Sequence, residues 1–282
     1  MSYWVAIVAR NASKHLPSTL DSLIHQSLKP KQLVIVNDGS NDWTGKLLLD
    51  YVKRYPNLLR VLTLPDNGYD IRRVPRNINL AYRSAAALGL NTEYFMISGD
   101  DCTYPSNYVA EHIARMTSES RIAVASGRSS TEGNLSEEHS PSGSGRMIRC
   151  SFWNDIGGRY PIKAGWETWL LYKALEKGFQ VKLFRDLTFH HARPRGAKHQ
   201  FEYWGAAMHS LGYHPLYAVG RVAKNMVGRY LAIKGSLNML RGYLRACLGS
   251  ADLFISSFEP SLRKFVLTEQ SRRIAKVVTG LL

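Results

Sequence analysis

Cysteine is scarce in this chain of 282 residues, which has three cysteines at positions 102, 150 and 247. They form neither a Cys-x-x-Cys motif nor a Cys/His cluster, which argues against a disulfide-stabilised scaffold and a zinc site and favours a reducing compartment. Long apolar runs are missing as well. The longest stretch without Asp, Glu, Lys or Arg, residues 203–220, contains two histidines and a proline. A spanning helix needs about 20 mostly apolar residues, so none is predicted. No signal peptide is expected, because residues 1–17 have no basic segment ahead of an apolar one.

Acidic residues are few relative to basic ones. The chain has 22 Asp and Glu against 37 Lys and Arg, a formal net charge of +15. Residues 221–282 contain eleven of the basic residues and three of the acidic ones. This excess points to an anionic partner: membrane lipid, a phosphorylated substrate or nucleic acid. We expect no nucleic acid, because aromatic and basic residues do not cluster and no nucleic-acid-binding motif appears. A basic nucleic-acid-binding protein stays an alternative function.

The apolar residues, by contrast, are plentiful (45%) and fall in patterns typical of alternating strands and helices. Continuous branched runs predict strands buried on both faces. The expected strands are residues 4–9, 32–37, 59–64, 93–97 and 180–184, and the expected helices are 17–27, 42–55, 77–88 and 166–177. Such alternation predicts an α/β fold with a mostly parallel sheet flanked by helices.

Two stretches depart from this pattern. Residues 126–146 are rich in Ser, Gly, Glu and Pro and are expected to form a long polar loop. Residues 221–282 are expected to be a basic amphipathic helical region, following a catalytic domain over residues 1–220. That region either lies on an anionic membrane surface or packs as a helical cap on the catalytic domain.

Polar residues follow three of the expected strands at their carboxyl ends, where parallel α/β sheets bind ligands. They are Ala9-Arg10-Asn11, Asp38-Gly39-Ser40 and the pair Asp100-Asp101. Two adjacent carboxylates repel each other unless water or a divalent cation relieves the repulsion. Taken alone, Asp38-Gly39-Ser40 is equally well explained as a turn, and the acidic pair is equally well explained as a helix cap. Together, the three sites favour a nucleotide-plus-metal site.

Several segments, in this order, resemble the GT-A nucleotide-binding half of family 2 glycosyltransferases. They are VAIVARNASKHLPSTLDSLIHQSL, VIVNDGSNDWT, PRNINLAYRSA, EYFMISGDD and GWETWLLYKALEKGF, the last similar to the acceptor-side helix of that family. The resemblance covers about residues 1–190. It implies a GT-A fold and the transfer of a sugar from a nucleotide-diphospho-sugar, with inversion, to an acceptor hydroxyl.

The resemblance also implies roles for individual residues of the donor site. Asp38 would hold the base of the nucleotide, and Ala9 and Arg10 would line the same pocket. Arg76 and Asn77 would lie near the ribose and diphosphate, where a helix N-terminus favours anions.

Metal and catalytic roles follow from the same resemblance. Asp100 would bind Mn²⁺ or Mg²⁺ on the diphosphate, and Asp101 would bind it too or face the sugar. Glu167 would be the general base, with an ordinary acid of a helix's first turn as the alternative. Two positions depart from the family pattern. Ser98 stands where the first acid of Asp-x-Asp-Asp is usual, and Thr168 stands where the second residue of Glu-Asp is usual.

Residues 190–198 and 142–146 offer further candidates. His190 and His191 could complete the metal shell, with His191 as the candidate ligand, or bind a phosphate; a structural histidine pair is the alternative. Arg193 and Arg195, with Lys198, are expected to bind the diphosphate, or else form a solvated turn. The glycines of residues 142–146 would let that segment close over the ligands, or it is a plain surface loop.

The expected protein is therefore a metal-dependent, inverting glycosyltransferase. We expect a nucleotide-sugar donor, a glycan or lipid-linked acceptor, and a location in the cytoplasm at the cytoplasmic face of a membrane. A GT-A protein that binds nucleotide without catalysis is the alternative that the two departures leave open.

Overall fold

A computed structural model describes residues 1–130, 141–193, 201–227, 233–249 and 252–280. The chain forms two compact units. Unit 1 comprises residues 1–160 and 177–194, and unit 2 comprises residues 161–176 and 195–282. The two units are thus divided differently from the two regions expected from the sequence, because residues 161–176 and 201–220 group with the C-terminal helices. Residues 220 and 221, where we placed the boundary, lie inside one helix.

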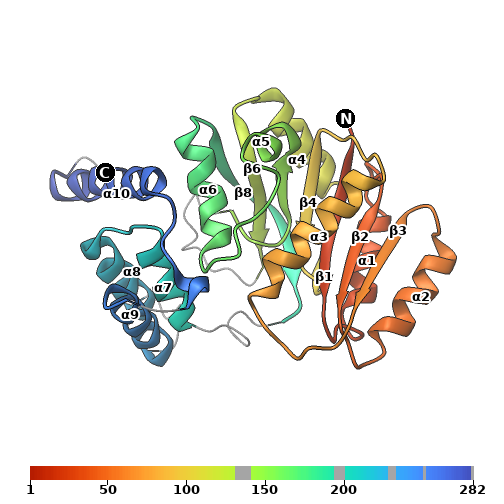
Figure 1. Cartoon of the computed structure of the whole chain (residues 1–282). Helices are drawn as coiled ribbons and strands as arrows, with labels where there is room; N and C mark the ends of the chain where they lie inside the picture. Colours follow the sequence, from red (N-terminus) through yellow and green to blue (C-terminus); the bar gives the residue numbers. More distant parts are fainter. Residues whose placement is uncertain (131–140, 194–200, 228–232, 250–251, 281–282) are drawn as a thin grey trace. The chain divides into compact units, whose positions relative to one another are not determined.

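Unit 1 is built on one mixed sheet, whose strands in spatial order are β3-β2-β1-β4-β7-β6-β8-β5 (Figure 1). The four strands β3 to β4 are parallel, β7 is antiparallel to both of its neighbours, and β6 and β8 are parallel. The strands are β1 (Tyr3–Ala9), β2 (Leu33–Asp38), β3 (Leu59–Leu64), β4 (Tyr94–Ser98), β5 (Cys102–Thr103), β6 (Ile122–Ser129), β7 (Arg146–Arg149) and β8 (Gln180–His191). The expected α/β class is confirmed.

The central strands β1, β2 and β4 are buried on both faces, as their apolar runs require. Along β1, Tyr3, Val5 and Ile7 belong to a core that includes residues of helices α1 (Leu16–Ile24) and α4 (Tyr108–Ser118). Trp4 points to the opposite face, where its ring stacks on that of Phe95 at 5.3 Å. Helix α3 (Arg73–Ala87) and helix α5 (Cys150–Asp155) contribute to that second aromatic cluster. Helix α2 (Thr44–Arg54) is the remaining helix among the described residues of unit 1.

The expected loop over residues 126–146 is shorter than predicted at both ends. Strand β6 continues to Ser129 and β7 begins at Arg146, while residues 131–140 lie outside the described residues. Gly127 is required within β6, because a Cβ there would lie 2.2 Å from the carbonyl oxygen of Leu187 on β8. Of the segment 142–146 that we considered a hinge, Arg146 is buried and donates to the carbonyl of Ser142 at 2.9 Å.

Strand β8 is more than twice the expected length, running to His191 instead of residue 184. Its register with β6 shifts between Gly127 and Arg128, so the ladder resumes after an irregularity. At its end, His191 pairs with Cys102 and His190 with Thr103 in an antiparallel bridge to β5. The long strand therefore brings residues 190–193 to the residues that follow β4.

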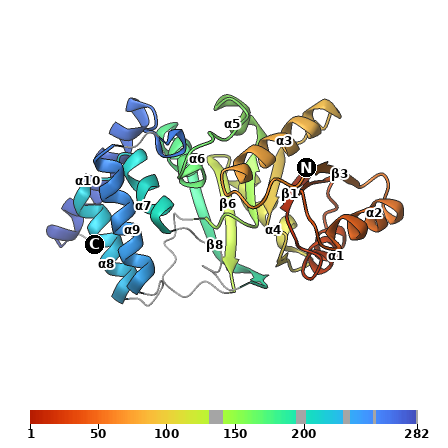
Figure 2. The ribbon, with the colours of Figure 1, turned by 60° about the horizontal axis from the view of Figure 1, so that its bottom comes forward.

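Unit 2 is helical in its described part. Its elements are α6 (Trp166–Glu176), α7 (Phe201–Ser210), α8 (Pro215–Val227), α9 (Ile233–Cys247), the 3₁₀ helix η1 (Leu253–Ile255) and α10 (Pro260–Val278). Helices α7, α8 and α9 lie side by side (Figures 1 and 2). Gly205 of α7 and Gly242 of α9 let these two helices approach closely. A Cβ at Gly205 would lie 1.8 Å from the carbonyl oxygen of Met239.

None of the described helices is long and apolar enough to cross a membrane. Of the three cysteines, Cys102 and Cys150 are buried in unit 1, whereas Cys247 is exposed at the end of α9.

Candidate active site

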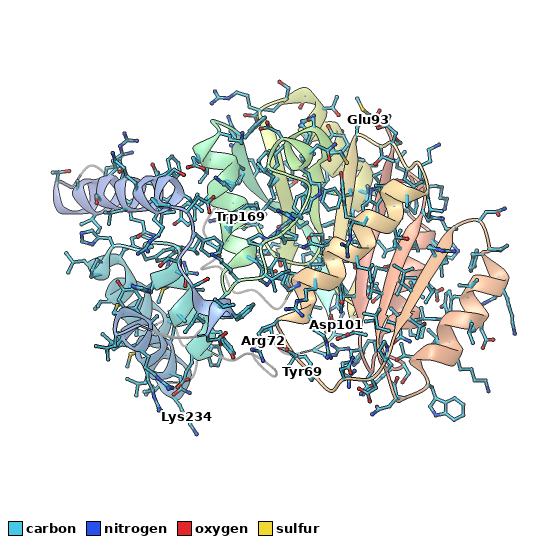
Figure 3. All side chains as sticks on the ribbon, in the orientation of Figure 1. Tyr69, Arg72, Glu93, Asp101, Trp169 and Lys234 are labelled. Atoms are coloured by element: carbon cyan, nitrogen blue, oxygen red, sulfur yellow. The ribbon has the colours of Figure 1, made fainter. Side chains whose placement is uncertain are left out.

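The carboxyl ends of β1, β2 and β4 lie at one edge of the unit 1 sheet. Figure 3 labels Asp101, just after β4, at this edge and Glu93, just before β4, at the opposite one. Tyr69 and Arg72, from the loop that joins β3 to α3, are labelled near the edge that holds Asp101. The polar residues expected at the strand ends are therefore on the same side of the sheet.

The end of β1 is shaped by a left-handed residue. Ala9, the last residue of β1, is fully buried, and Asn11 has a φ of 49°. Asparagine tolerates this region better than most residues other than glycine. Its side-chain oxygen accepts a hydrogen bond from the N–H of Asn41 at 2.9 Å. This bond links the turn after β1 to the turn after β2.

Arg10 connects the ends of two strands to a neighbouring loop. Its Nη1 donates to the carbonyl oxygens of Asp38, at 2.5 Å, and of Gly39, at 2.7 Å. Its Nη2 forms an ion pair with Asp66 at 2.6 Å. The Arg10 guanidinium lowers the pKa of the Asp66 carboxyl by a direct hydrogen bond. The side chain of Arg10 therefore braces the turn after β2 against the loop that contains Asp66.

Asp38 is buried at the end of β2 and has a partner that the sequence did not reveal. The Nε of Arg73 lies 3.2 Å from its carboxylate. The guanidinium of Arg73 also donates to the carbonyl oxygens of Asn67 and Gly68. The sequence signal for this contact was the arginine-rich segment before the third helix. The Asp38 carboxylate is thus held beside the positive charge of the Arg73 guanidinium.

Helix α3 begins at Arg73, four residues before the expected start at residue 77. Arg76 is exposed and Asn77 is buried. Both follow residues 73–75, whose backbone N–H groups are the ones that a helix N-terminus could offer to an anion. The N–H groups of Arg73 and Val74 already donate to carbonyl oxygens of residues 70 and 71, and Pro75 has none. The expected reason for anion binding at Arg76, a helix N-terminus, is therefore wrong. What α3 offers an anion here is the Arg76 side chain.

Asp100 and Asp101 are both buried just beyond β4. The backbone N–H of Arg10 donates to Asp100 Oδ2 at 3.4 Å, which ties the acidic pair to the end of β1. Burial raises the pKa of Asp100, and the nearby Arg193 opposes that rise. Gly99 is closely surrounded, since a Cβ there would lie 2.9 Å from Ser144 Oγ and 3.0 Å from Cys102 Sγ. The pair is thus held in a tightly packed turn.

Ser98, which replaces the first acid of the family motif, is turned away from this pair. It is buried, and its hydroxyl lies 2.9 Å from the hydroxyl of Tyr104. It also donates to the carbonyl oxygen of Gly99 at 2.8 Å.

The side chains of Asp101 and His191 meet, as a shared metal site would require. His191 Nε2 lies 3.3 Å from Asp101 Oδ1. The other ring nitrogen, Nδ1, is 2.8 Å from the carbonyl oxygen of Arg193, which can only accept a hydrogen bond. In the neutral ring Nδ1 therefore carries the proton, and Nε2 presents its lone pair to the carboxylate side.

The chemistry of this cluster suits a hard divalent ion. Asp101, Cys102 and His191 each place one ligand atom within 4.8 Å of the others. Burial raises the pKa of the Cys102 thiol to about 12. Thiolate is a soft ligand that suits Zn²⁺ or Cu⁺ better than Mn²⁺ or Mg²⁺. Oxygen and imidazole ligands suit Mn²⁺, and one buried oxygen, Asp101 Oδ2, has no hydrogen-bond partner in the described residues. Asp101 and His191 therefore fit a Mn²⁺ or Mg²⁺ ion, and Asp100 is the neighbour of Asp101 in the chain.

The remaining residues expected in the site do not all lie beside the acidic pair. His190 is exposed, and its Nδ1 lies 3.2 Å from Ser130 Oγ, so it points away from the acidic pair. Arg193 contacts Asp100 at 3.0 Å. Arg195, like Lys198, lies outside the described residues. Glu167 belongs to unit 2, where it is exposed in the first turn of α6.

Comparison with known proteins shows the family of the chain. A family model described as glycosyl transferase family 2 matches residues 4–179. The chain belongs to glycosyl transferase family 2. The family and the enzyme class expected from the motifs, a glycosyltransferase, are confirmed.

Individual members and solved structures show how far the likeness extends. A stretch of 71 residues is 38% identical to dolichyl-phosphate beta-glucosyltransferase ALG5A of Trichomonas vaginalis, and it covers 22% of each protein. The match thus spans about a fifth of that curated relative. The mannosyltransferase PcManGT from Pyrobaculum calidifontis, in complex with GDP-Man and Mn²⁺, has a TM-score of 0.58 at 16% identity, over 99% of this chain and 86% of that one. S. aureus TarS 1-349 in complex with UDP-GlcNAc has a TM-score of 0.57 at 18% identity, over 86% and 72%. These structures confirm the GT-A fold of the family 2 chain.

Proposed function

We propose that this family 2 protein transfers a sugar from a nucleotide-diphospho-sugar to an acceptor hydroxyl, with inversion and with the assistance of a divalent metal ion. The observation that carries the proposal is the convergence of Arg10, Asp38, Asp100, Asp101 and His191 at one edge of the unit 1 sheet. Two structures with the same fold were obtained with nucleotide-sugars, GDP-Man and UDP-GlcNAc, which supports a donor of this class.

In the proposed donor site the base lies against Asp38, while Ala9, fully buried at the end of β1, supports the site from beneath. Arg10 holds the carbonyl oxygens of Asp38 and Gly39, so it fixes the position of the pocket wall. Asn77 is buried, and its side-chain Nδ2 has no hydrogen-bond partner among the described residues. That donor, with the exposed guanidinium of Arg76, would serve the ribose and diphosphate.

Asp100, Asp101 and His191 would hold the metal ion, either Mn²⁺ or Mg²⁺. When bound, the ion stabilises negative charge that develops on the nucleoside diphosphate as it leaves. The protein's own contribution is to hold two carboxylates and one imidazole in fixed positions. Asp100 is tied to the N–H of Arg10 and His191 to the carbonyl of residue 193, so neither needs to reorganise.

Glu167 is the proposed general base, which removes the proton of the acceptor hydroxyl as that oxygen attacks the anomeric carbon. It is the only acid in the first turn of α6. Thr168 follows it where a second acid is usual in the family, so the role falls to Glu167 alone. A Glu167→Gln variant should bind donor as the wild type does and lose turnover.

We also propose that helix α9 brings the protein to an anionic membrane at its cytoplasmic face, which would suit a lipid-linked or membrane-associated glycan acceptor. Its buried residues lie on one side, against α7 and α8. On the opposite side an apolar stripe is exposed, consisting of Ile233 (63% exposed), Leu237, Leu244 and the following Leu248 (90% exposed). Lys234, Arg241 and Arg245 flank this stripe, and Figure 3 labels Lys234 on α9. A basic helix with an apolar face is typical of peripheral binding to anionic lipid.

Vesicle sedimentation tests this part of the proposal. The wild type should bind vesicles containing phosphatidylglycerol and not pure phosphatidylcholine vesicles. A Leu244→Asp/Leu248→Asp variant should lose that binding. Leu49→Asp on α2, an exposed leucine of unit 1, is the matched control and should bind as the wild type does. Equal binding by all three proteins contradicts the role of α9.

The donor site is tested by thermal denaturation with UDP-, GDP-, dTDP- and CDP-sugars, each with Mn²⁺ and with EDTA. A ligand at 100 times its Kd stabilises the folded protein by about 2.7 kcal/mol. We expect a shift with one nucleotide that EDTA abolishes, and that is absent in Asp101→Asn. If none of the four donors shifts the denaturation temperature, the proposed function is contradicted.

A further inference from the structure

Arg193 occupies the position between the two carboxylates of the acidic pair. Its Nη1 lies 3.0 Å from Asp100 Oδ1, and its Nε lies 3.6 Å from Asp101 Oδ2. Both carboxylates are buried, and the arginine itself is only about one-quarter exposed. Two adjacent buried carboxylates are stable together only with a positive charge beside them. In this protein the guanidinium supplies that charge.

The contacts of this group are incomplete in a way that points to another partner. Asp101 Oδ2 and Arg193 Nη2 are both buried, and neither has a hydrogen-bond partner in the described part of the chain. A buried polar group without a partner is costly, and it is usually found where a ligand binds. One of these atoms is an acceptor suited to a cation, and the other is a donor suited to an anion.

We infer that Arg193 is a built-in counter-cation that competes with the divalent metal ion for Asp100 and Asp101. The inference rests on the metal site in the proposed function. A divalent ion on these carboxylates would lie within a few ångströms of the guanidinium and repel it. Binding of the metal ion therefore requires the Arg193 side chain to leave the pair.

The backbone of residue 193 can remain in place while the side chain moves. Its carbonyl oxygen accepts the Nδ1 proton of His191, which holds the imidazole toward Asp101 in either arrangement. The released guanidinium, with five donors in a planar fork, matches the oxygens of a diphosphate. Arg193 would thus neutralise the carboxylates in the free protein and the diphosphate in the complex. Metal and donor would then favour each other's binding.

Mn²⁺ titration of the nucleotide-free protein, followed by the electron paramagnetic resonance signal of free Mn²⁺, tests the competition directly. A contact to a charged group is worth about a factor of ten or more in an equilibrium constant. We expect Arg193→Gln to bind Mn²⁺ about tenfold more tightly than the wild type or better. Arg115→Gln is the matched control, because it also removes one positive charge and one ion pair, that between Arg115 and Asp186 on the surface of unit 1. This variant should bind Mn²⁺ as the wild type does.

Arg193→Gln binding Mn²⁺ equally or more weakly than the wild type would overturn the inference. Asp101→Asn separates this failure from that of the metal site. If Asp101→Asn loses the Mn²⁺ affinity that the wild type shows, the metal site is supported whatever the result for Arg193→Gln. If neither the wild type nor any variant binds Mn²⁺, the metal site and the inference are both wrong.

A second measurement uses the wild type alone, so that it is independent of the folding of any variant. Phenylglyoxal reacts with accessible guanidinium groups, and the extent of modification at Arg193 is read by peptide mass spectrometry. We expect Mn²⁺ to increase modification of Arg193 and to leave that of Arg115 unchanged. No increase at Arg193 under conditions in which Mn²⁺ is bound would show that the side chain stays on the carboxylates.

Discussion

The close approach of helices α7 and α9 gives a prediction whose size follows from the geometry. Gly205→Ala places a methyl group where the Cβ would lie 1.8 Å from the carbonyl oxygen of Met239 and 2.6 Å from the N–H nitrogen of Tyr243. Both neighbours are backbone atoms of α9, so no side chain can rotate to make room. The two helices must separate at this point.

The cost can be estimated from the size of that separation. Ordinary contacts begin at 3.4 Å, so the carbonyl oxygen must retreat by about 1.6 Å. Overpacking of this kind typically costs about 1–3 kcal/mol, and the rigid backbone puts this site at the upper end. Alanine recovers about 1 kcal/mol through its better helix propensity. We expect Gly205→Ala to lower the free energy of unfolding by about 2 kcal/mol.

Gly220→Ala in α8 is the matched control, because nothing lies within 4 Å of its Cβ position. It should raise the free energy of unfolding by up to about 1 kcal/mol. Gly242→Ala meets the carbonyl oxygen of Glu202 at 2.0 Å and should behave like Gly205→Ala. The double variant should lose less than the sum, since one separation relieves both clashes. Urea unfolding followed by circular dichroism measures all four, and a Gly205→Ala protein as stable as the wild type would refute the reasoning.

Two further predictions concern unit 1. Burial lowers the pKa of His112 from 6.5 to about 4, so between these values the unfolded chain binds a proton that the folded protein does not. The free energy of unfolding should therefore fall by up to about 3 kcal/mol as the pH drops from 7 to 4. Urea midpoints at pH 7 and pH 5 should differ less in His112→Leu, and equal differences would contradict this. Arg10→Lys keeps the charge but loses the fork that holds the carbonyls of Asp38 and Gly39. Calorimetry should show nucleotide affinity falling about tenfold or more, with exposed Arg60→Lys as the control; unchanged affinity would refute the bracing role.

The parts of the fold that could be predicted from the sequence are those whose local pattern matches their final environment. Strands β1, β2 and β4 shift by one residue from their expected bounds, because each is a mostly apolar run buried on both faces. Strand β3 has the expected bounds although it is largely half-buried or exposed. Strand β6 was missed. It contains Ser126, Gly127 and Arg128, residues that form a strand only because β7 and β8 pair with them.

The second half of β8 illustrates the same limit. Residues 185–188 alternate weakly and are largely exposed or half-buried, so no apolar pattern extends the strand beyond residue 184. The extension depends on pairing with β6 and β5, which are distant in sequence. It is nevertheless what carries His191 and Arg193 to the acidic pair.

In the site, the residues that directly end a strand could be predicted, and the long side chains could not. Asp38, Asp100 and Asp101 stand where the sheet puts them. Arg193 and Arg73 form ion pairs with Asp100 and Asp38, which are distant in sequence. The spacing of residues in the sequence does not indicate which carboxylate each arginine contacts. The roles of the individual residues stay predictions that the experiments above decide.

The distribution of the cysteines makes helix α9 accessible to spectroscopy without any engineered site. Cys102 and Cys150 are buried, and Cys247 is exposed directly before Leu248. A thiol-reactive fluorophore should therefore label the native chain at one end of α9 in preference to the buried positions. A polarity-sensitive dye at that thiol would emit at shorter wavelength in a lipid environment than in water. The wild-type chain thus carries its own reporter for whether, and how fast, the end of this helix enters a bilayer.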